Sequence, residues 1–443
     1  MDTAQLKRFA QKARKSLMGT VEAKLGAVLA PDSLARRENK SAISALEGLI
    51  NEIGKEQVIE KVAYTWFNRF CALRFMDVNH YSKIGIVSSA ENQTQPEILA
   101  EAKMGYYDDA IINPETKEQI NKLLNTSQDD AYKTLLVAYC NSFNKLMPFM
   151  FERINDYTEL LIPDNLLAQN SVLSQTIETL TPENCKDVEV IGWLYQYYIS
   201  EAKEILDYEL KNKKNRKVQK NDMPAKTQIF TPKWIVSYMV ENSVGKLWLE
   251  SHPDNKLQSQ FKYYLEPAEQ EDDVKVKLEE LKNKDLKPQD IKVLDPACGS
   301  GHILVTAFSV LFEIYKSIGY QDNEIPEMIL KNNLYGLDIC DRAAQLAQFA
   351  VMMKAREFDR NIFNKVKELN ICSIKDTDWM DVWVEKELLQ GVKDEKYAKE
   401  QIDLLKNTFH DAKEYGSILD VKGIDFDFWE ERLTFIRNLA QQQ

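Results

Sequence analysis

The residue types best suited to chemistry lie in one short stretch, from Ile291 to Leu304, which reads IKVLDPACGSGHIL. A short apolar run ends in Asp295, and a turn that contains Gly299 and Gly301 follows it. A long apolar-periodic segment then begins, as expected for a helix. This order of strand, glycine-rich turn and helix predicts the opening unit of a nucleotide-binding α/β domain.

The turn has a definite binding chemistry. Glycines let the backbone approach a ligand closely and adopt positive φ. The free N–H groups at the start of the following helix favour an anionic group such as a carboxylate. Asp295 is expected at the carboxyl end of its strand, where open α/β sheets bind ligands, and its charge suits a cationic or hydroxyl-bearing ligand and would repel a pyrophosphate. The alternative, a structural turn that binds nothing, is disfavoured because Asp-Pro-x-Cys-Gly-Ser-Gly fixes six of its seven positions.

Two common nucleotide-binding motifs do not fit this turn. The dinucleotide pattern requires a third glycine or alanine, and Leu304 occupies that position. The P-loop requires Gly-Lys-Ser/Thr, and Gly301 is followed by His302.

The segment DPACGSG, residues 295–301, resembles motif I of the amino-group DNA methyltransferases, which bind S-adenosylmethionine. In that family the glycine turn receives the methionine part of the cofactor, and an acid at the end of the second strand takes the ribose hydroxyls. The run NLYGLDI, residues 333–339, resembles motif II and places an acid at Asp338. The extra residues around 323–328 explain why Asp338 lies farther from the turn than the roughly 20 residues usual for a Rossmann unit.

An upstream segment, TQIFTPKWIV at residues 227–236, resembles the Phe-Tyr-Thr-Pro segment of the gamma-type enzymes, which closes over the methionine end of the cofactor. Taken alone, it also fits a plain helix start with Thr231 as N-cap and Pro232 in the first turn. Its place about sixty residues before motif I favours the cofactor interpretation. The cofactor-binding residues that the resemblance implies are Phe230, Thr231, Pro232, Asp295, Pro296, Ala297, Cys298, Gly299, Gly301, Asp338 and Ile339.

The likeness extends beyond these motifs. Residues 64–70 (YTWFNRF), 192–198 (GWLYQYY) and 409–417 (FHDAKEYGS) are similar to the PglX family, the adenine-specific methyltransferases of BREX phage-defence systems. The resemblance runs from Leu6 to Asn438 and covers only the N-terminal portion of that family. It implies part of a site-specific enzyme that transfers a methyl group from S-adenosylmethionine to adenine N6 in double-stranded DNA. Other phage-defence proteins are possible partners.

Composition sets limits on the class of protein. The 443 residues are 44% hydrophobic and 28% charged, as in ordinary globular proteins. No apolar run approaches 18 residues and the N-terminus lacks an apolar signal core, so neither a membrane span nor export is expected. The six cysteines are scattered without a CxxC pair, which argues against a zinc site and a disulfide framework and favours a reducing cytoplasm. No metal ligand is assigned. The net charge of −12 indicates that the main DNA-holding surface lies outside this chain.

The predicted fold class is an α-helical N-terminal domain, residues 1–220, followed by an incomplete α/β Rossmann-like S-adenosylmethionine-dependent methyltransferase domain, residues 221–443. The first 40 residues predict a basic amphipathic helix, which contacts phosphate, a partner subunit or only solvent. The charge run at residues 211–220 predicts an exposed loop and domain boundary, with a role in phosphate contact left open against that of a solvated linker. Strands are expected near residues 291–294, 334–338 and 369–374. Trp379, Trp383 and Trp429 are interpreted as packing residues.

Adenine-N6 transfer also needs a clamp for the flipped base. In the family this clamp is Asn/Asp-Pro-Pro-Tyr/Phe, and none of the thirteen prolines here is adjacent to another. We therefore assign no catalytic residue and expect this chain alone to be inactive. One alternative is a non-catalytic module that binds S-adenosylmethionine or a partner. A second is part of a fused restriction-modification enzyme, whose nuclease would need Glu-x-Lys on a strand; residues 22–24 and 201–203 have that spelling but lie in helical patterns.

Overall fold

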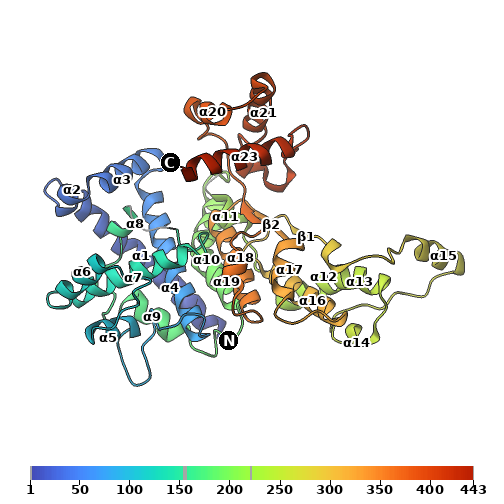
Figure 1. Cartoon of the computed structure of the whole chain (residues 1–443), viewed down its shortest axis with the longest axis horizontal. Helices are drawn as coiled ribbons and strands as arrows, with labels where there is room; N and C mark the ends of the chain where they lie inside the picture. The colour runs from blue at the N-terminus through green and yellow to red at the C-terminus, as the bar shows by residue number, and fades with distance from the viewer. Residues whose placement is uncertain (1, 153–156, 220–221, 443) are drawn as a thin grey trace.

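The computed structural model describes residues 2–152, 157–219 and 222–442. Up to residue 219, the regular elements described there are α-helices, which lie on the left and in the centre of Figure 1. They are α1 (Thr3–Leu29), α2 (Leu34–Glu38), α3 (Lys40–Ile53), α4 (Lys55–Val78), α5 (Glu97–Lys103), α6 (Pro114–Leu124), α7 (Gln128–Asn144), α8 (Tyr157–Leu160), α9 (Val172–Thr179) and α10 (Glu189–Asn212).

The chain then continues through helices that precede a small sheet. These are α11 (Met223–Thr227), α12 (Lys233–Val240), the π-helical segment η2 (Glu241–Gly245), α13 (Lys246–Ser251), α14 (Asn255–Gln258), α15 (Asp272–Leu281) and the 3₁₀ turn η3 (Pro288–Asp290). The expected single helix from residue 233 to residue 250 is thus divided by a π-helical turn.

The sheet has three parallel strands in the order β1-β2-β3, and each lies close to its predicted position. β1 (Val293–Asp295) pairs with β2 (Leu334–Asp338), and β2 pairs with β3 (Ile371–Ser373). Between the strands run α16 (His302–Ser317), α17 (Ile325–Asn332), α18 (Asp341–Arg356) and α19 (Ile362–Lys365). The parallel register places Asp295 opposite Gly336, two positions before Asp338 at the predicted end of the second strand.

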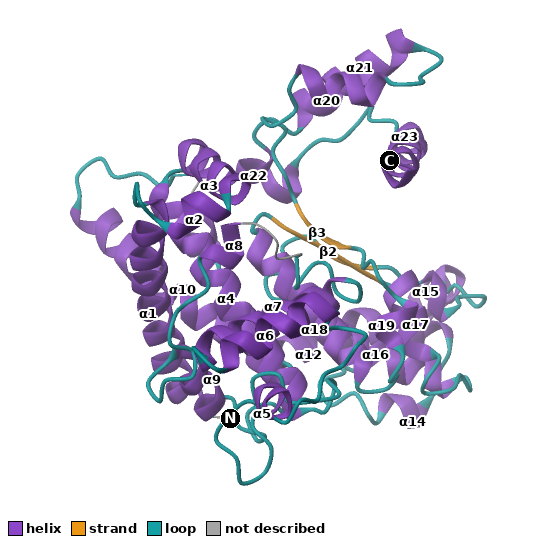
Figure 2. Cartoon of the chain, turned by 60° about the vertical axis from the view of Figure 1, so that its left-hand side comes forward, coloured by secondary structure: helices purple, strands orange, loops and turns teal. Residues whose placement is uncertain are grey.

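Helices cover one face of this sheet. α16 packs against β1 and β2, and α18 packs against β2 and β3, on the same side of the strands (Figure 2). Gly336 explains part of this close packing, because a Cβ at this position would lie 2.8 Å from Cδ1 of Leu304 in α16. On the opposite face Leu294 is 58% exposed and Cys372 is also exposed. The sheet is therefore one-sided within the described residues.

One hydrophobic core runs from Leu6 in α1 to Ile371 in β3, so the N-terminal helices and the sheet share it. α10 is the central connection, since it packs against α1 on one side and α18 on the other. The predicted boundary between residues 220 and 221 lies outside the described residues, and the division into two domains stays a proposal.

Helix α1 is the predicted basic amphipathic helix. Its predicted apolar face from Leu6 to Leu17 is buried, and the buried stripe continues to Val28. Several of its basic side chains form ion pairs with other helices. These pairs are Lys7–Glu204 at 3.4 Å, Arg14–Glu60 at 3.6 Å, Lys15–Glu201 at 2.7 Å and Lys24–Asp164 at 2.8 Å. Much of the positive charge of α1 is thus paired with carboxylates elsewhere in the same chain.

The last residues form an arm above the sheet in Figure 1. It contains α20 (Val382–Leu389), α21 (Glu395–Thr408), α22 (Ala412–Tyr415), the 3₁₀ turn η4 (Gly416–Ile418) and α23 (Phe426–Gln442). The arm has a separate small core that includes Trp429. The packing interpretation was wrong for Trp379 and Trp383, which are 64% and 68% exposed. Trp379 lies just before α20 and Trp383 in its first turn, where no described element covers them.

A charge cluster joins the N-terminal helices to the sheet helices. Glu60 of α4 pairs with Arg342 of α18 at 3.0 Å and with Arg14 of α1 at 3.6 Å. Burial raises the pKa of the Glu60 carboxyl, but the two guanidinium groups outweigh burial and the pKa is lowered overall. A carboxyl with a lowered pKa stabilises the fold above its unfolded pKa, and that stabilisation is lost as pH falls through the folded pKa.

We therefore expect Glu60→Gln to lower the free energy of unfolding at pH 7. The loss should be about 1–2 kcal/mol, less than for a fully buried pair because Glu60 is partly solvated. Urea denaturation measures it, and the difference from the parent chain should shrink as pH falls below 4.5. The matched control is Glu22→Gln, whose exposed partner Lys55 lies 3.5 Å away and whose loss should cost less than about 0.5 kcal/mol. Equal losses in the two variants would contradict the expectation.

Candidate functional site

The glycine turn after β1 has the backbone conformation that its sequence requires. Gly299 and Gly301 have φ values of 55° and 84°, a region that side chains strongly disfavour. A Cβ on Gly301 would also lie 2.9 Å from Cα of Ala347 in α18. The glycines thus permit both the tight turn and the close approach of α16 to α18.

Asp338 connects the second strand to this turn. One oxygen of its carboxylate accepts a hydrogen bond from the Gly299 N–H at 2.8 Å, and the other accepts one from the Cys340 N–H at 2.7 Å. The backbone N–H of Cys298 donates to the carbonyl of Leu337 at 2.9 Å. The two predicted motifs, 39 positions apart, therefore form one hydrogen-bonded unit at the carboxyl edge of the sheet.

Asp295 has a buried carboxylate that is only half used. Its Oδ1 accepts a hydrogen bond from the Ala297 N–H at 3.2 Å, whereas its Oδ2 is buried without a hydrogen-bond partner. Burial raises the pKa of this carboxyl, and the charge of Asp338 raises it further. Burial also raises the pKa of the Asp338 carboxyl. A buried oxygen without a partner is costly, so this site favours a ligand that brings a positive charge or a donor.

The segment that contains Phe230 packs next to the glycine turn, between His302 and Trp193. The Phe230 ring stacks on His302, with centroids 4.6 Å apart and planes 7° apart, and it contacts Trp193 of α10 with centroids 4.5 Å apart. Thr231 is half-buried and Pro232 is exposed. Pro232, not Thr231, is the N-cap of α12, and no side chain caps that helix. The plain helix-start interpretation of Thr231 was therefore wrong in its capping detail.

The remaining predicted residues surround the same turn. Pro296 and Ala297 are exposed, Cys298 is buried, and burial raises the pKa of its thiol well above the usual range. Ile339 is half-buried beside the arm, where a Cβ on Gly416 would lie 3.2 Å from its Cγ2. The structure thus brings the residues of motifs I and II together, and it stacks Phe230 on His302, the first residue after the glycine turn.

Sequence reasoning missed two contributions to this region. Gly192 of α10 lies against the turn, because a Cβ on it would be 2.3 Å from Cε2 of Phe230 and 3.0 Å from Oγ of Ser300. Lys413 of the arm lies 3.6 Å from Asp341 at the start of α18, next to Lys375 at 2.7 Å. Residues 192–198 and 409–417 stood out in the sequence by resemblance, but nothing in their spacing indicated a place beside the turn.

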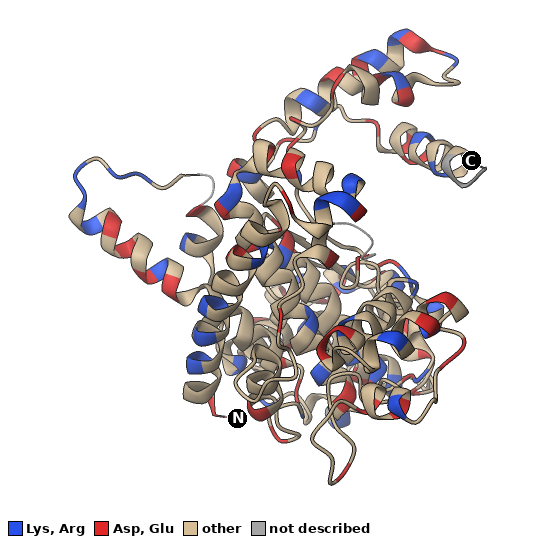
Figure 3. Ribbon diagram, turned by 90° about the vertical axis from the view of Figure 1, so that its left-hand side faces the viewer, with Lys and Arg blue, Asp and Glu red and all other residues tan. Residues whose placement is uncertain are grey.

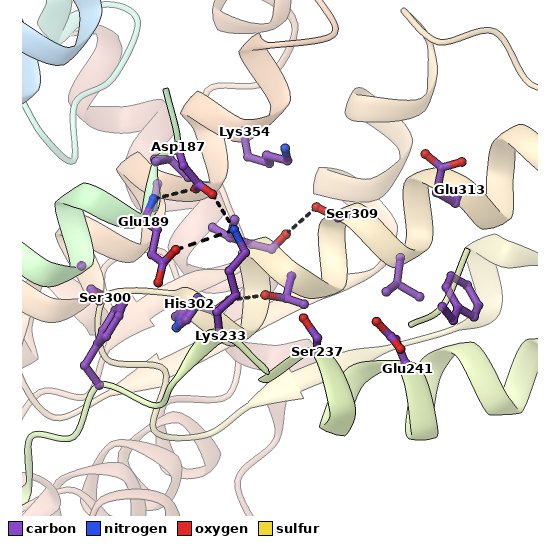
Figure 4. A pocket seen from close by; sticks show the side chains of 18 of the residues that line it. Asp187, Glu189, Lys233, Ser237, Glu241, Ser300, His302, Ser309, Glu313 and Lys354 are labelled. Atoms are coloured by element: carbon purple, nitrogen blue, oxygen red, sulfur yellow. Dashed lines mark hydrogen bonds and ion pairs between the residues drawn. The ribbon is translucent and has the colours of Figure 1, made fainter. Parts of the chain in front are cut away.

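A cavity of about 380 Å³ lies behind the turn, between the start of α10 and helices α12, α16 and α18 (Figure 4). Phe230, Ser300 and His302 line one end of it, and Lys233 crosses it to pair with Asp187 at 2.6 Å. Asp295 and Asp338 do not line this cavity. The predicted acids therefore lie at the carboxyl ends of β1 and β2, outside this cavity.

The chain is similar in sequence to known DNA methyltransferases. The family described as "MmeI, DNA-methyltransferase domain" matches residues 268–382, which include the turn and all three strands. The adenine-specific methyltransferase BrxX of Escherichia coli O9:H4 is 44% identical over 338 residues, 75% of this chain and 27% of that protein. The adenine-specific methyltransferase PglX of Lacticaseibacillus casei is 31% identical over 476 residues, 96% of this chain and 38% of that protein. The resemblance to the PglX family is confirmed.

The chain thus spans about a quarter to two fifths of the length of these PglX-type relatives. A Methanocaldococcus jannaschii protein, whose name combines a type II restriction enzyme with a methyltransferase, is 25% identical over 331 residues, 66% of this chain and 25% of that protein. The PglX-type relatives therefore match more closely than the relative that carries a restriction enzyme in its name.

The contact of Gly192 with Phe230 makes a sharp test of this arrangement. Gly192→Ala should lower the free energy of unfolding by roughly 1–3 kcal/mol, because the new methyl group overlaps the Phe230 ring in a packed site. Urea denaturation measures the loss, and the emission of Trp193 should shift at the same time.

The control is Gly48→Ala in α3, where nothing lies within 4 Å of the added Cβ. That change should be neutral or stabilising by up to about 1 kcal/mol, since alanine is the better helix former. If Gly192→Ala behaved like Gly48→Ala, the close contact would be wrong.

Proposed function

We propose that this chain is the cofactor-binding part of a DNA adenine-N6 methyltransferase of a phage-defence system, with S-adenosylmethionine as the methyl donor. Two relatives support the reaction, because both are named adenine-specific methyltransferases. The matched family, a DNA-methyltransferase domain, supports DNA as the substrate class. None of the described helices is long and apolar enough to cross a membrane.

The observation that carries the proposal is the buried Oδ2 of Asp295, which has no hydrogen-bond partner beside a glycine turn. The donor set fits S-adenosylmethionine. Asp295 would take the positively charged amino group of its methionine part, and the N–H groups at the start of α16 would take the carboxylate. Asp338 would take the ribose hydroxyls, because each of its oxygens uses only part of its acceptor capacity on backbone N–H groups. Phe230, Thr231 and Pro232 would cover the methionine end, and Pro296, Ala297, Cys298 and Ile339 would complete the walls.

The bound cofactor would supply an electrophilic methyl group on sulfur. This chain's part is to hold the cofactor in one orientation, with Asp295 and Asp338 fixed from two strands. Holding reactants in the correct geometry supplies about 7–11 kcal/mol of barrier reduction in favourable cases. Burial of the two acids strengthens their attraction for a cationic ligand, because the local dielectric is lower than in water.

A second candidate function is a non-catalytic module that binds S-adenosylmethionine. The observation that favours it is the lack of adjacent prolines, which removes the Asn/Asp-Pro-Pro-Tyr/Phe clamp from this sequence. The two candidates share the cofactor site and differ in whether a clamp on further polypeptide completes the reaction.

The first test is a calorimetric titration of the chain with S-adenosylmethionine. Asp295→Asn and Asp338→Ala should each weaken binding by roughly ten- to a hundredfold, the usual value of a hydrogen bond to a charged group. The control Asp322→Asn changes an exposed acid in the loop after the C-terminal end of α16 and should leave binding unchanged. Unchanged binding in both site variants would overturn the assignment of the cofactor site.

Asp295→Asn also separates a ligand role from a structural one. A carboxyl whose pKa is raised in the folded chain destabilises the fold above that pKa, and this effect vanishes below the unfolded value of 3.8. The Tm of the ligand-free variant should therefore equal or exceed that of the parent at pH 7.5, and any gain should disappear as pH falls toward 3.8. A large fall in Tm at pH 7.5 would indicate that Asp295 serves folding instead of binding.

A methylation assay distinguishes the two candidate functions. The chain alone should bind S-adenosylmethionine and produce no N6-methyladenine in duplex DNA. Adding the remaining portion of a PglX-type relative, as a separate polypeptide, should restore methylation if the chain is the cofactor part of an enzyme. Methylation by the chain alone would show that it needs no added clamp.

A further inference from the structure

The end of α10 and the loop after it form the basic tip, defined here as residues 211–219. The tip stands out from the body in Figure 3, where its Lys and Arg residues form a blue segment. Eight of these nine residues are exposed, and Arg216 is half-buried. The surrounding residues 204–226 hold seven basic and four acidic residues, in a chain whose net charge is −12. The tip is therefore a local excess of positive charge on an acidic protein.

Arg216 holds the tip in a defined conformation. Its guanidinium pairs with Glu209 of α10 at 3.2 Å and with Asp222 at 2.7 Å, and it also donates to the Lys217 carbonyl. The N–H of Gln219 donates to the carboxylate of Asp222 at 2.8 Å. Arg216 thus links α10 to the segment after the loop through its two ion pairs, and the lysines of the tip project from this linked loop.

The acids near the tip leave part of its charge uncompensated. Glu204 pairs with Lys7, Asp207 pairs with Lys226, and Glu209 and Asp222 pair with Lys213 and Arg216. Within the part of the chain that the structure describes, Lys211, Lys214 and Lys217 form no ion pair. These three exposed ammonium groups are the positive charges of the tip that no nearby acid among the described residues pairs with. Tyr208, which is 68% exposed one turn earlier, offers an additional hydroxyl donor.

The same helix that carries the tip also supports the cofactor site. Gly192 near its start lies against the glycine turn, and Tyr195 donates its hydroxyl to Sγ of Cys340, two residues after Asp338, at 3.4 Å. Lys203 donates to the carbonyl of Gln228, just before Phe230, at 2.7 Å. At 1.5 Å per residue, Lys211 lies roughly 28 Å along the helix from Gly192. That is less than one turn of duplex DNA, about 34 Å, so one duplex can reach both.

We propose that Lys211, Lys214 and Lys217 bind the phosphate backbone of duplex DNA and hold it while a base is presented to the cofactor site. This proposal rests on the proposed function. Lysines are flexible point charges, which suits contacts with a regular row of phosphates that carry no sequence information. Because Arg216 fixes the loop to α10, the three lysines stay at a fixed distance from the glycine turn after β1. An acidic protein partner is the competing occupant, and the test below distinguishes it.

The test measures binding of a 30-base-pair duplex by fluorescence anisotropy at several salt concentrations. In the variant Lys211→Gln/Lys214→Gln/Lys217→Gln, the slope of log K against log salt should become shallower by about 2.7, since each lost phosphate contact contributes about 0.9. The parent chain should therefore lose about fortyfold more affinity than the variant between 50 and 200 mM salt. The matched control Lys277→Gln/Lys393→Gln/Lys396→Gln removes the same charge from exposed lysines elsewhere and should keep the parent slope.

A second measurement needs no substitution. Duplex DNA should protect the three tip lysines of the parent chain from acetylation, as read by mass spectrometry, and leave Lys277, Lys393 and Lys396 reactive. Protection by polyglutamate without protection by DNA would assign the tip to an acidic protein and overturn the proposal. So would equal salt slopes in the two triple variants, or no DNA binding at 50 mM salt. The S-adenosylmethionine titration of the same variant tests the cofactor site separately, so loss of one activity identifies which proposal fails.

Discussion

The hydrogen bond from the Gly299 N–H to the carboxylate of Asp338 is the contact on which the site depends. It joins the turn after β1 to the end of β2, and it needs both strands in parallel register. Gly336 makes the register possible, because only a residue without a side chain lets α16 lie this close to β2. The bond also fixes the half-buried Asp338 carboxylate near the buried Asp295, and the proximity of the two acids raises the pKa of Asp295. A cationic ligand would relieve the repulsion between the two carboxylates.

Helix α10 extends this constraint to the N-terminal helices. It contacts the turn through Gly192, contacts Cys340 through Tyr195, and shares a core with α1 and α18. The Glu60–Arg342 pair adds a second connection between the same parts. The N-terminal helices therefore support the proposed cofactor site through α10. A change in their packing should reach the turn through a single rigid helix.

The sheet is covered on one face by α16 and α18, and its other face leaves Leu294 and Cys372 exposed. Parallel sheets are normally covered on both faces, since their strands are apolar on both. Under the proposed function, the clamp for a flipped base would be supplied by further polypeptide, because no two prolines in this sequence are adjacent. The basic tip lies outside the sheet altogether, which suits a role in holding DNA while the chemistry depends on groups elsewhere.

The sequence by itself determined the local elements of this site. Apolar runs ending in acids predicted β1 and β2, with the bounds of β2 matched at both ends, and the glycine spacing predicted the turn and the start of α16. These features follow from φ preferences and side-chain periodicity, which act over a few residues. Tertiary structure alone decided that Gly192 lies against Phe230, that Asp295 keeps an oxygen without a partner, and that Trp379 and Trp383 stay exposed. Those outcomes depend on which helices meet after the chain has packed, and residues far apart in the sequence carry no local signal of that meeting.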